Sequence, residues 1–193
     1  MLTICYKMTL RPINSGWIEM ICGSMFSGKT EELIRRIRRA EIAKMNTIIF
    51  KPQIDDRYSS SHVVSHNQSK LASKLVKHSK EILDESSKMD VIGIDEAQFF
   101  DNDIVKVCKS LANNNKRVVV AGLDTDYLGN PFGPVPALMC EADYLDKLTA
   151  ICMQCGNPAS FSQRLTQDSE QVVIGEKDIY EARCRNCFEV PKK

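Results

Sequence analysis

Short apolar segments alternate with amphipathic segments along most of this chain. Short runs rich in Val, Ile and other apolar residues predict buried strands, whereas apolar residues that recur at helical spacing predict helices. The predicted strands lie at residues 17–22, 46–51, 90–95, 116–122 and 143–151. The predicted helices lie at residues 31–43, 77–87, 102–114 and 134–140.

Strands that alternate with helices in this way indicate an α/β fold, with a parallel sheet that is covered on both faces. In such sheets, ligands bind beyond the carboxyl ends of the strands. The polar, serine-rich residues 53–69 interrupt the alternation and predict a loop or a weakly formed hairpin. We therefore expect the chemistry of the chain in the segments that directly follow its predicted strands.

The segment between the first predicted strand and the first predicted helix has the pattern G-x-x-x-x-G-K-T. Its glycines let backbone N–H groups curl around an anion at the positive end of the helix dipole. The lysine of such a loop reaches the β- and γ-phosphates of a nucleotide. A glycine turn with a chance lysine is the alternative, but the flanking strand and helix favour a phosphate loop. The predicted phosphate-binding residues are Gly23, Ser24, Met25, Phe26, Ser27, Gly28, Lys29 and Thr30.

Two acids, Asp95 and Glu96, directly follow the apolar run at residues 91–94. In a nucleotide site, the first acid after such a strand usually completes the shell of Mg²⁺, which prefers one or two carboxylates besides phosphate oxygens. The sequence therefore predicts that Asp95 and the hydroxyl of Thr30 hold Mg²⁺. Glu96 is then placed to take a proton from an attacking hydroxyl group. A helix cap or surface acids are the alternative for such a pair considered alone.

Two Cys-x-x-Cys pairs, Cys152/Cys155 and Cys184/Cys187, predict a structural zinc site of four thiolates. Disulfides are a poorer alternative in a cytoplasmic chain, and a redox motif would explain only one of the pairs. The residues between the pairs include an apolar strip and Tyr180, which suits a zinc-pinned loop over a small ring-shaped substrate. A zinc-ribbon interaction module is the alternative.

Composition narrows the class of protein further. The 193 residues are 43% hydrophobic and 26% charged, which is typical of one globular domain or of one domain with a small appendage. A net charge of +1 disfavours binding to nucleic acid. No apolar run approaches the roughly 20 residues of a membrane span, and the first residues lack a signal pattern. We therefore expect a cytoplasmic protein without membrane contact.

Taken together, the ordered blocks of this sequence resemble the type II, zinc-containing thymidine kinase family. The resemblance extends from Gly16 to Pro191 and implies a P-loop NTPase-like (RecA-like) core with a small C-terminal zinc-binding lasso domain. The matching blocks are residues 23–30, 50–58, 64–66, 94–100, 121–124 and 130–133, together with both cysteine pairs. The implied division is a lead-in at residues 1–15, a nucleotide-binding domain at 16–150 and the lasso domain at 151–193.

The resemblance also implies ATP-dependent phosphorylation of the 5′-hydroxyl of thymidine, with deoxyuridine as a second substrate, in deoxynucleotide salvage. It gives Glu96 the role of proton acceptor, and it adds Asp55, Arg57, Asp95 and Gln98 to the nucleotide site. It further implies a homotetramer and feedback inhibition by thymidine triphosphate. The residues that it places around the nucleoside are Met25, Phe99, Tyr127, Phe132, Gln171, Val172, Val173, Ile174, Gly175 and Tyr180.

Other classes of protein share some of these features. A switch GTPase would carry an Asn-Lys-x-Asp segment after the fourth strand, and this sequence has none there. A phosphate-loop NTPase with a zinc ribbon that binds nucleic acid is the main alternative, and the near-zero net charge disfavours it. A non-enzymatic zinc adaptor would leave the phosphate loop unexplained.

Overall fold

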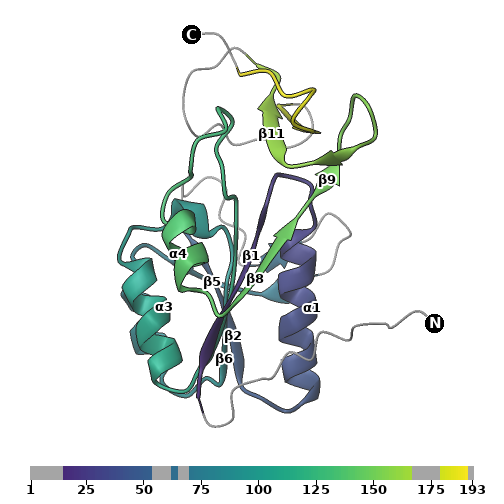
Figure 1. The fold of residues 1–193 in the computed structure, drawn as a ribbon. Helices are drawn as coiled ribbons and strands as arrows, with labels where there is room; N and C mark the ends of the chain where they lie inside the picture. The colour runs from purple at the N-terminus through teal and green to yellow at the C-terminus, as the bar shows by residue number, and fades with distance from the viewer. Residues whose placement is uncertain (1–14, 54–61, 65–69, 167–178, 191–193) are drawn as a thin grey trace, which may run out of the picture.

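The structure, a computed structural model, describes residues 15–53, 62–64, 70–166 and 179–190 (Figure 1). A parallel sheet of six strands forms its centre, in the order β5-β2-β6-β7-β1-β8. Every neighbouring pair in this sheet is parallel, which confirms the predicted α/β class. The strands are β1 (Trp17–Gly23), β2 (Thr47–Pro52), β5 (Lys74–Val76), β6 (Val91–Ile94), β7 (Arg117–Gly122) and β8 (Tyr144–Leu148).

Helices cover both faces of the sheet (Figure 1). On one face, α1 packs its apolar side, including Leu33 and Ile37, against Ile21 and Val119 of the central strands. The other face is covered by α2, α3 and α4, whose apolar residues form the larger core cluster with β1, β6 and β7. The helices are α1 (Lys29–Ile42), α2 (Glu81–Glu85), α3 (Ile104–Asn113) and α4 (Val135–Glu141), and a 3-10 turn, η1, spans Ala97–Phe99. None of the helices in the described ranges is long and apolar enough to cross a membrane.

The structure refines several of the predicted elements and adds short strands that were not predicted, such as β5. Helix α2 covers only part of the predicted range 77–87, because the backbone N–H groups of Lys77 and His78 donate to Glu81 Oε1 at 3.0 and 2.8 Å instead of continuing the helix. The predicted strand 143–151 is divided, since β9 (Ala150–Ile151) leaves the large sheet. Edge strand β5 follows a short antiparallel hairpin of β3 (His62–Val64) and β4 (Lys70–Ala72), in line with the hairpin alternative for this polar region.

The C-terminal part of the chain forms two small antiparallel sheets beyond the carboxyl ends of the large one (Figure 1). One sheet pairs β9 with β10 (Pro158–Ala159), and the other pairs β11 (Phe161–Arg164) with β12 (Tyr180–Arg183). A separate core cluster, which includes Ala159 and Ala182, holds these sheets together. Phe161 also stacks on Phe188, with ring centroids 4.5 Å apart. Residues 150–166 and 179–190, which carry these sheets, are called the C-terminal unit below.

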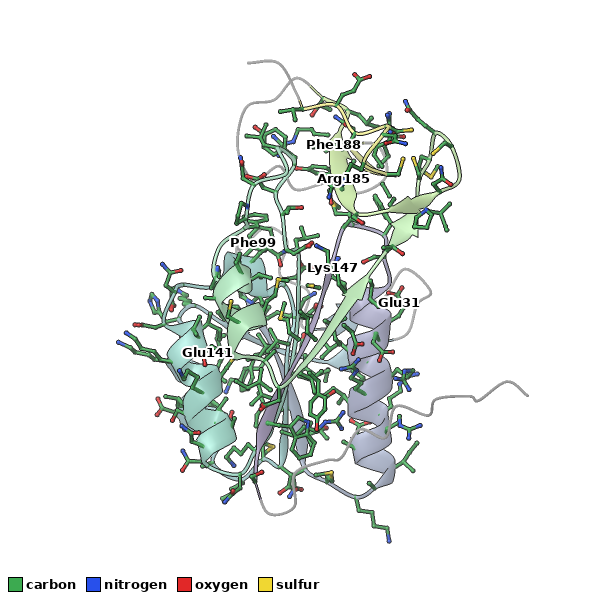
Figure 2. All side chains as sticks on the ribbon, in the orientation of Figure 1. Glu31, Phe99, Glu141, Lys147, Arg185 and Phe188 are labelled. Carbon is green, nitrogen blue, oxygen red and sulfur yellow. The ribbon has the colours of Figure 1, made fainter. Side chains whose placement is uncertain are left out.

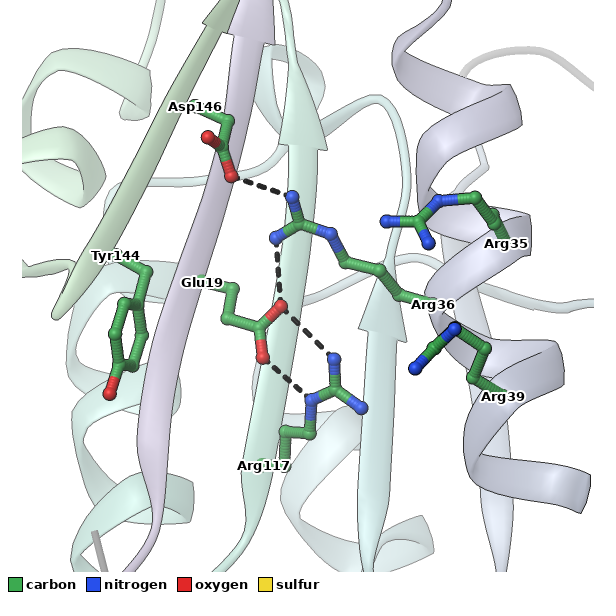
Figure 3. Close-up of a pocket in the computed structure, with 7 residues that line it drawn as sticks. All are labelled: Glu19, Arg35, Arg36, Arg39, Arg117, Tyr144 and Asp146. Carbon is green, nitrogen blue, oxygen red and sulfur yellow. Dashed lines mark hydrogen bonds and ion pairs between the residues drawn. The ribbon is translucent and has the colours of Figure 1, made fainter. Parts of the chain in front are cut away.

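A buried ion network joins α1 to three strands of the sheet (Figure 3). Glu19 of β1 accepts hydrogen bonds from Arg117 Nε of β7 at 2.6 Å and from Arg36 Nη1 of α1 at 2.7 Å. Arg36 Nη2 then donates to Asp146 of β8 at 2.6 Å. The indole N–H of Trp17 donates to the same Glu19 at 2.7 Å. The network therefore fixes the helix that follows the predicted phosphate loop against the strands beneath it.

Candidate active site

The predicted phosphate loop lies at the carboxyl end of β1 and leads directly into α1. Gly23 has a φ of 140°, and a Cβ atom there would lie 2.2 Å from the carbonyl oxygen of Leu148. Gly28, which precedes α1, has a φ of 86° and a left-handed conformation. Both glycines are therefore required by the backbone, and the loop takes the turn for which its sequence pattern selects.

Polar groups of the loop converge on one carbonyl group. Ser27 Oγ donates to the carbonyl oxygen of Ser24 at 2.8 Å, and Lys29 Nζ donates to the same oxygen at 2.7 Å. Burial lowers the pKa of Lys29, and the charges of Glu96, Asp95 and Asp124 oppose this shift. Lys29 thus lies in the field of three carboxylates at strand ends, where its ammonium group is the matching positive charge.

Asp95 follows β6 and is almost fully buried, with 3% of its surface exposed. Within the described residues, its Oδ2 atom has no hydrogen-bond partner, and Lys51 Nζ is 3.9 Å away. Burial raises the pKa of Asp95 to about 7, and the charge of Glu96 adds to this shift. A buried carboxylate oxygen without a donor has the character of a ligand for a hard cation such as Mg²⁺. Asp95 therefore has the character of the predicted magnesium ligand, and Thr30, the second predicted ligand, lies in the first turn of α1.

Glu96 is held in an uncommon backbone conformation at the start of η1, with φ 54° and ψ 42°. Gln98 Nε2 donates to Glu96 Oε2 at 2.6 Å, and Gln98 Oε1 accepts the backbone N–H of Leu123 at 2.9 Å. Gln98 is itself buried. The carboxylate of Glu96 is therefore oriented by an amide whose other end is fixed to the segment after β7.

Aromatic side chains line the neighbouring part of the same edge of the sheet. Phe99 and Phe132 meet edge to face, with ring centroids 5.6 Å apart. The backbone N–H of Phe132 donates to the carbonyl oxygen of Asp124 at 3.1 Å, which fixes this ring to the end of β7. Figure 2 shows Phe99 and Lys147 at the carboxyl-end edge of the large sheet, with Arg185 and Phe188 beyond them in the C-terminal unit.

The C-terminal unit is hydrogen-bonded directly to the predicted phosphate loop. Ser24 Oγ donates to the carbonyl oxygen of Ala159 at 3.2 Å. The backbone N–H of Met25 donates to Ser162 Oγ at 2.9 Å. The structure therefore brings the loop, Asp95, Glu96, Phe99 and Phe132 to one edge of the large sheet, with Tyr180 on β12 of the C-terminal unit beyond it. The predicted contacts at Asp55, Arg57 and residues 171–175 lie outside the described residues.

Sequence reasoning missed several polar residues of this region. Asp124 is buried, with Lys147 Nζ at 2.6 Å from Oδ2, and within the described ranges its Oδ1 atom has no hydrogen-bond partner. Ser162 and Arg164 of β11 are also buried and contact other predicted site residues. Asp124 ends the matching block 121–124, just beyond a predicted strand, but neither that block nor its position assigns it a role. Ser162 and Arg164 belong to no local motif that names their chemistry.

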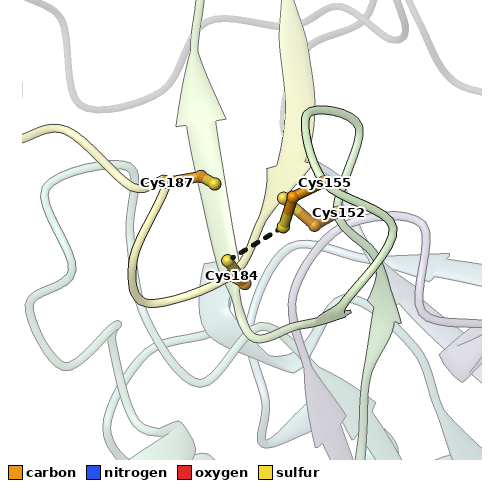
Figure 4. A group of neighbouring side chains, drawn as sticks. All are labelled: Cys152, Cys155, Cys184 and Cys187. Atoms are coloured by element: carbon orange, nitrogen blue, oxygen red, sulfur yellow. Dashed lines mark hydrogen bonds between the residues drawn. The ribbon is translucent and has the colours of Figure 1, made fainter.

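The four predicted zinc ligands do come together (Figure 4). Their Sγ atoms all lie within 4.8 Å of one another, and those of Cys155 and Cys184 are 3.5 Å apart. Thiolates around zinc, at about 2.3 Å from the metal, lie about 3.8 Å apart in a tetrahedron. Burial alone would raise the pKa of Cys152, but backbone N–H groups of Cys184, Cys155 and Gln154 lower it to about 6. The arrangement therefore matches a four-cysteine zinc site.

The fold and the side-chain clusters define an α/β protein in which a four-cysteine cluster lies beyond the carboxyl edge of a parallel sheet. A family model described as Thymidine kinase matches residues 16–188. A thymidine kinase of Rhodothermus sp. (strain ITI 518) is 56% identical over 177 residues, which is 92% of this chain and 83% of that protein. A thymidine kinase of Bacteroides thetaiotaomicron is 55% identical over 173 residues, which is 90% of this chain and 87% of that protein. The chain therefore belongs to the thymidine kinase family and is an enzyme.

Proposed function

We propose that this enzyme transfers the γ-phosphoryl group of ATP to the 5′-hydroxyl of thymidine, and of deoxyuridine as a second substrate. Membership of the thymidine kinase family carries the thymidine phosphorylation itself, as a step of deoxynucleotide salvage. The assignment of individual residues is supported by the arrangement at the carboxyl edge of the sheet. Binding to nucleic acid is the weaker alternative, because the net charge is only +1.

On the phosphate side, we assign residues 23–30 to the triphosphate of ATP. The strand order supports a RecA-like core, because a single strand, β7, separates the strand that bears this loop from the strand that ends at Asp95. Thr30 and Asp95 would hold Mg²⁺, which neutralises charge on the phosphates when it is bound. Lys29 adds a further positive charge from the protein. Together these groups stabilise the charge of the transferring phosphoryl group.

Glu96 is assigned as the base that accepts the proton of the 5′-hydroxyl. One observation carries this assignment: the carboxylate of Glu96 is oriented by Gln98 beside the buried Asp95, in the field that also reaches Lys29. A carboxylate that is oriented before the substrate binds lowers the entropic part of the barrier to proton transfer. The unusual backbone conformation of Glu96 is then part of that positioning.

For the nucleoside, we assign one wall to Phe99, Phe132, Tyr127 and Tyr180, with Met25 beneath the base. The meeting of Phe99 and Phe132 near Glu96 supports this wall. Contacts of Asp55 and Arg57 with the phosphates, and of residues 171–175 with the base, stay predictions. The separate core of the C-terminal unit supports the division into a nucleotide-binding domain at residues 16–150 and a zinc-binding lasso domain at 151–193.

Zinc has a structural purpose in this proposal. All four thiols are taken up by one cluster, so no position is left for a substrate, as in closed structural sites. A cytoplasmic location is proposed as well, because a four-thiolate zinc site suits a reducing compartment better than disulfides do. A homotetramer and feedback inhibition by thymidine triphosphate stay expectations from the family resemblance.

The decisive experiment measures ADP release with thymidine, deoxyuridine, deoxycytidine and no acceptor. We expect turnover with the first two nucleosides and little with deoxycytidine, whose amine is a donor where the thymine ring offers an acceptor. Glu96→Gln should lower turnover about 10²- to 10⁴-fold, the usual contribution of a general base, while the affinity for ATP is retained. Glu141→Gln, an exposed acid on α4, is the matched control and should not change turnover.

Two results would contradict the proposal. A loss of turnover below about tenfold in Glu96→Gln would remove Glu96 as the base, because general base catalysis is worth more than that. Tight binding of DNA at physiological salt, without nucleoside-dependent ADP release, would favour the nucleic-acid alternative instead.

A further inference from the structure

Arg164 is a buried cation at the end of β11, with 4% of its surface exposed. Its Nη2 and Nε atoms both donate to the hydroxyl oxygen of Tyr180, at 2.6 and 3.2 Å. The guanidinium carbon also lies 3.6 Å from the ring centroid of Tyr127, which is the distance of close cation–π stacking. One side chain therefore contacts both tyrosines that are assigned to the nucleoside wall.

These tyrosines come from two different parts of the fold. Tyr180 opens β12 and faces Arg164 directly in the last pair of the β11–β12 ladder. Tyr127 belongs to the segment that follows β7, which rises beside β11 in Figure 1. Asp126 Oδ1 folds that segment into a tight turn by accepting the backbone N–H groups of Leu128 and Asn130, each at 2.9 Å. Arg164 thus connects a rigid turn of the sheet domain with the C-terminal unit.

The contacts with the two tyrosines require arginine rather than an apolar side chain of the same volume. Burying a charge is unfavourable unless hydrogen bonds and ring contacts compensate for it, so simple packing would be served better by an apolar residue. A guanidinium group is planar, so it stacks on one ring while its edge donates two hydrogen bonds in the same plane. A lysine ammonium group supplies the charge but lacks this plane and edge.

We propose that Arg164 is a positioning residue for the nucleoside, acting through Tyr127 and Tyr180. It sets the two rings relative to each other and thereby fixes the width of the aromatic wall. Both of these partners belong to the nucleoside wall, so loss of Arg164 should affect the nucleoside more than the triphosphate. This inference rests on the proposed nucleoside wall and adds to it the residue that holds the wall in place.

The test compares the effect of each substitution on the KM for thymidine with its effect on the KM for ATP. Arg164→Gln should raise the KM for thymidine about 10- to 100-fold, since hydrogen bonds to a charged group and a stacking contact are lost together, whereas the KM for ATP should change less than about threefold. Tyr180→Phe removes only the accepting hydroxyl and should raise the thymidine KM about 5- to 15-fold. The control is Arg185→Gln, an exposed arginine of the same unit that lies 5.1 Å from the Phe161 ring centroid. It should leave both KM values unchanged.

Further variants distinguish positioning from a general structural effect. Arg164→Lys should recover part of the loss, because the ammonium group keeps the contact with the Tyr127 ring. Tyr127→Leu combined with Arg164→Gln should raise the thymidine KM less than the product of the single effects, as expected for residues in one network. Zinc content and melting temperature, measured on each variant, verify that the C-terminal unit is folded.

Results that contradict the role of Arg164 can be distinguished from results that contradict the proposed function. Equal changes in the KM values for thymidine and ATP, or a melting temperature that falls in parallel with activity, would overturn the positioning of the nucleoside by Arg164. An unchanged thymidine KM in folded Arg164→Gln would overturn it as well. Failure of the unmodified enzyme to phosphorylate thymidine would instead contradict the proposed function.

Discussion

Replacement of Glu19 by Gln tests the ion network that joins α1 to the sheet. The side chains of Glu19 and Arg117 are only 8% and 9% exposed, and that of Arg36 is 11% exposed. Glu19→Gln keeps the shape and removes the negative charge that lies between the two guanidinium groups. Arg36 retains Glu32 and Asp146 as partners. Among the described residues, Arg117 pairs with no other carboxylate, so its charge would stay buried without compensation.

The expected cost follows from this burial. Removing one partner of a buried ion pair destabilises proteins by about 3–5 kcal/mol. In a chain of this length, about 1 kcal/mol corresponds to a shift of about 2–4 °C in melting temperature, so we expect a decrease of about 6–20 °C. Glu141→Gln removes the exposed pair with Lys109 and should cost no more than about 1 kcal/mol.

The chain carries a single tryptophan, and its indole N–H donates to Glu19. Urea unfolding followed by tryptophan fluorescence therefore reports on the network itself, and circular dichroism provides an independent probe of the fold. A free energy of unfolding that falls by less than about 1 kcal/mol in Glu19→Gln would refute the reasoning, because a buried, uncompensated Arg117 must cost more.

The pH dependence of the stability of the same variant gives a second test of the ion network. Burial alone would raise the pKa of Glu19, but hydrogen bonds from Arg117 and Trp17 and the charges of both arginines hold it below its usual value of 4.5. A carboxylate whose pKa is lowered by folding contributes stability above its unfolded pKa, and this contribution is lost as the pH falls through its folded pKa. The difference between the parent protein and Glu19→Gln should therefore be largest at neutral pH and shrink below about pH 4.5.

Two further substitutions address the candidate site and the zinc cluster. Gly133→Ala would place a Cβ atom 2.3 Å from the carbonyl oxygen of Gln98, so it should cost about 2–4 kcal/mol and lower turnover, measured by urea unfolding and ADP release. Gly156→Ala, also at positive φ but with nothing nearby, should cost only about 1 kcal/mol, and equal losses would contradict the clash. Cys184→Ser should abolish stoichiometric zinc and speed amide exchange in the C-terminal unit, since such zinc sites contribute about 10–16 kcal/mol of folding free energy. Cys140→Ser, an exposed free thiol, should change neither, and full zinc occupancy in Cys184→Ser would exclude the four-cysteine site.

The strongly patterned elements could be predicted from the sequence alone. Strands β1 and β7 and helix α1 lie where apolar periodicity places them, because each buries a long, regular apolar surface. The four cysteines could be assigned because their spacing is set by the ligand geometry of one metal. In these cases the local sequence and the tertiary fold demand the same residues.

Other features depend on contacts that no local pattern reveals. Strand β5 has only three residues and exists because it pairs with β2. The start of α2 is determined partly by Asp101, whose carboxylate accepts hydrogen bonds from both the N–H and the hydroxyl of Ser79. Arg164 acquires its partners only when β11, β12 and the segment after β7 are assembled. Sequence reasoning therefore finds residues that act in motifs and misses residues that act across elements.

The hydrogen bonds from Ser24 to Ala159 and from Met25 to Ser162 join residues 23–30 to the C-terminal unit. A ligand that moved either of these two parts would strain the same pair of hydrogen bonds. By thermodynamic linkage, such an effect on affinity is mutual. If a nucleoside raises the affinity for ATP, then ATP raises the affinity for the nucleoside by the same factor. This coupling adds to the contacts that each substrate makes on its own side, so a substitution that alters one side alone changes one affinity more than the other.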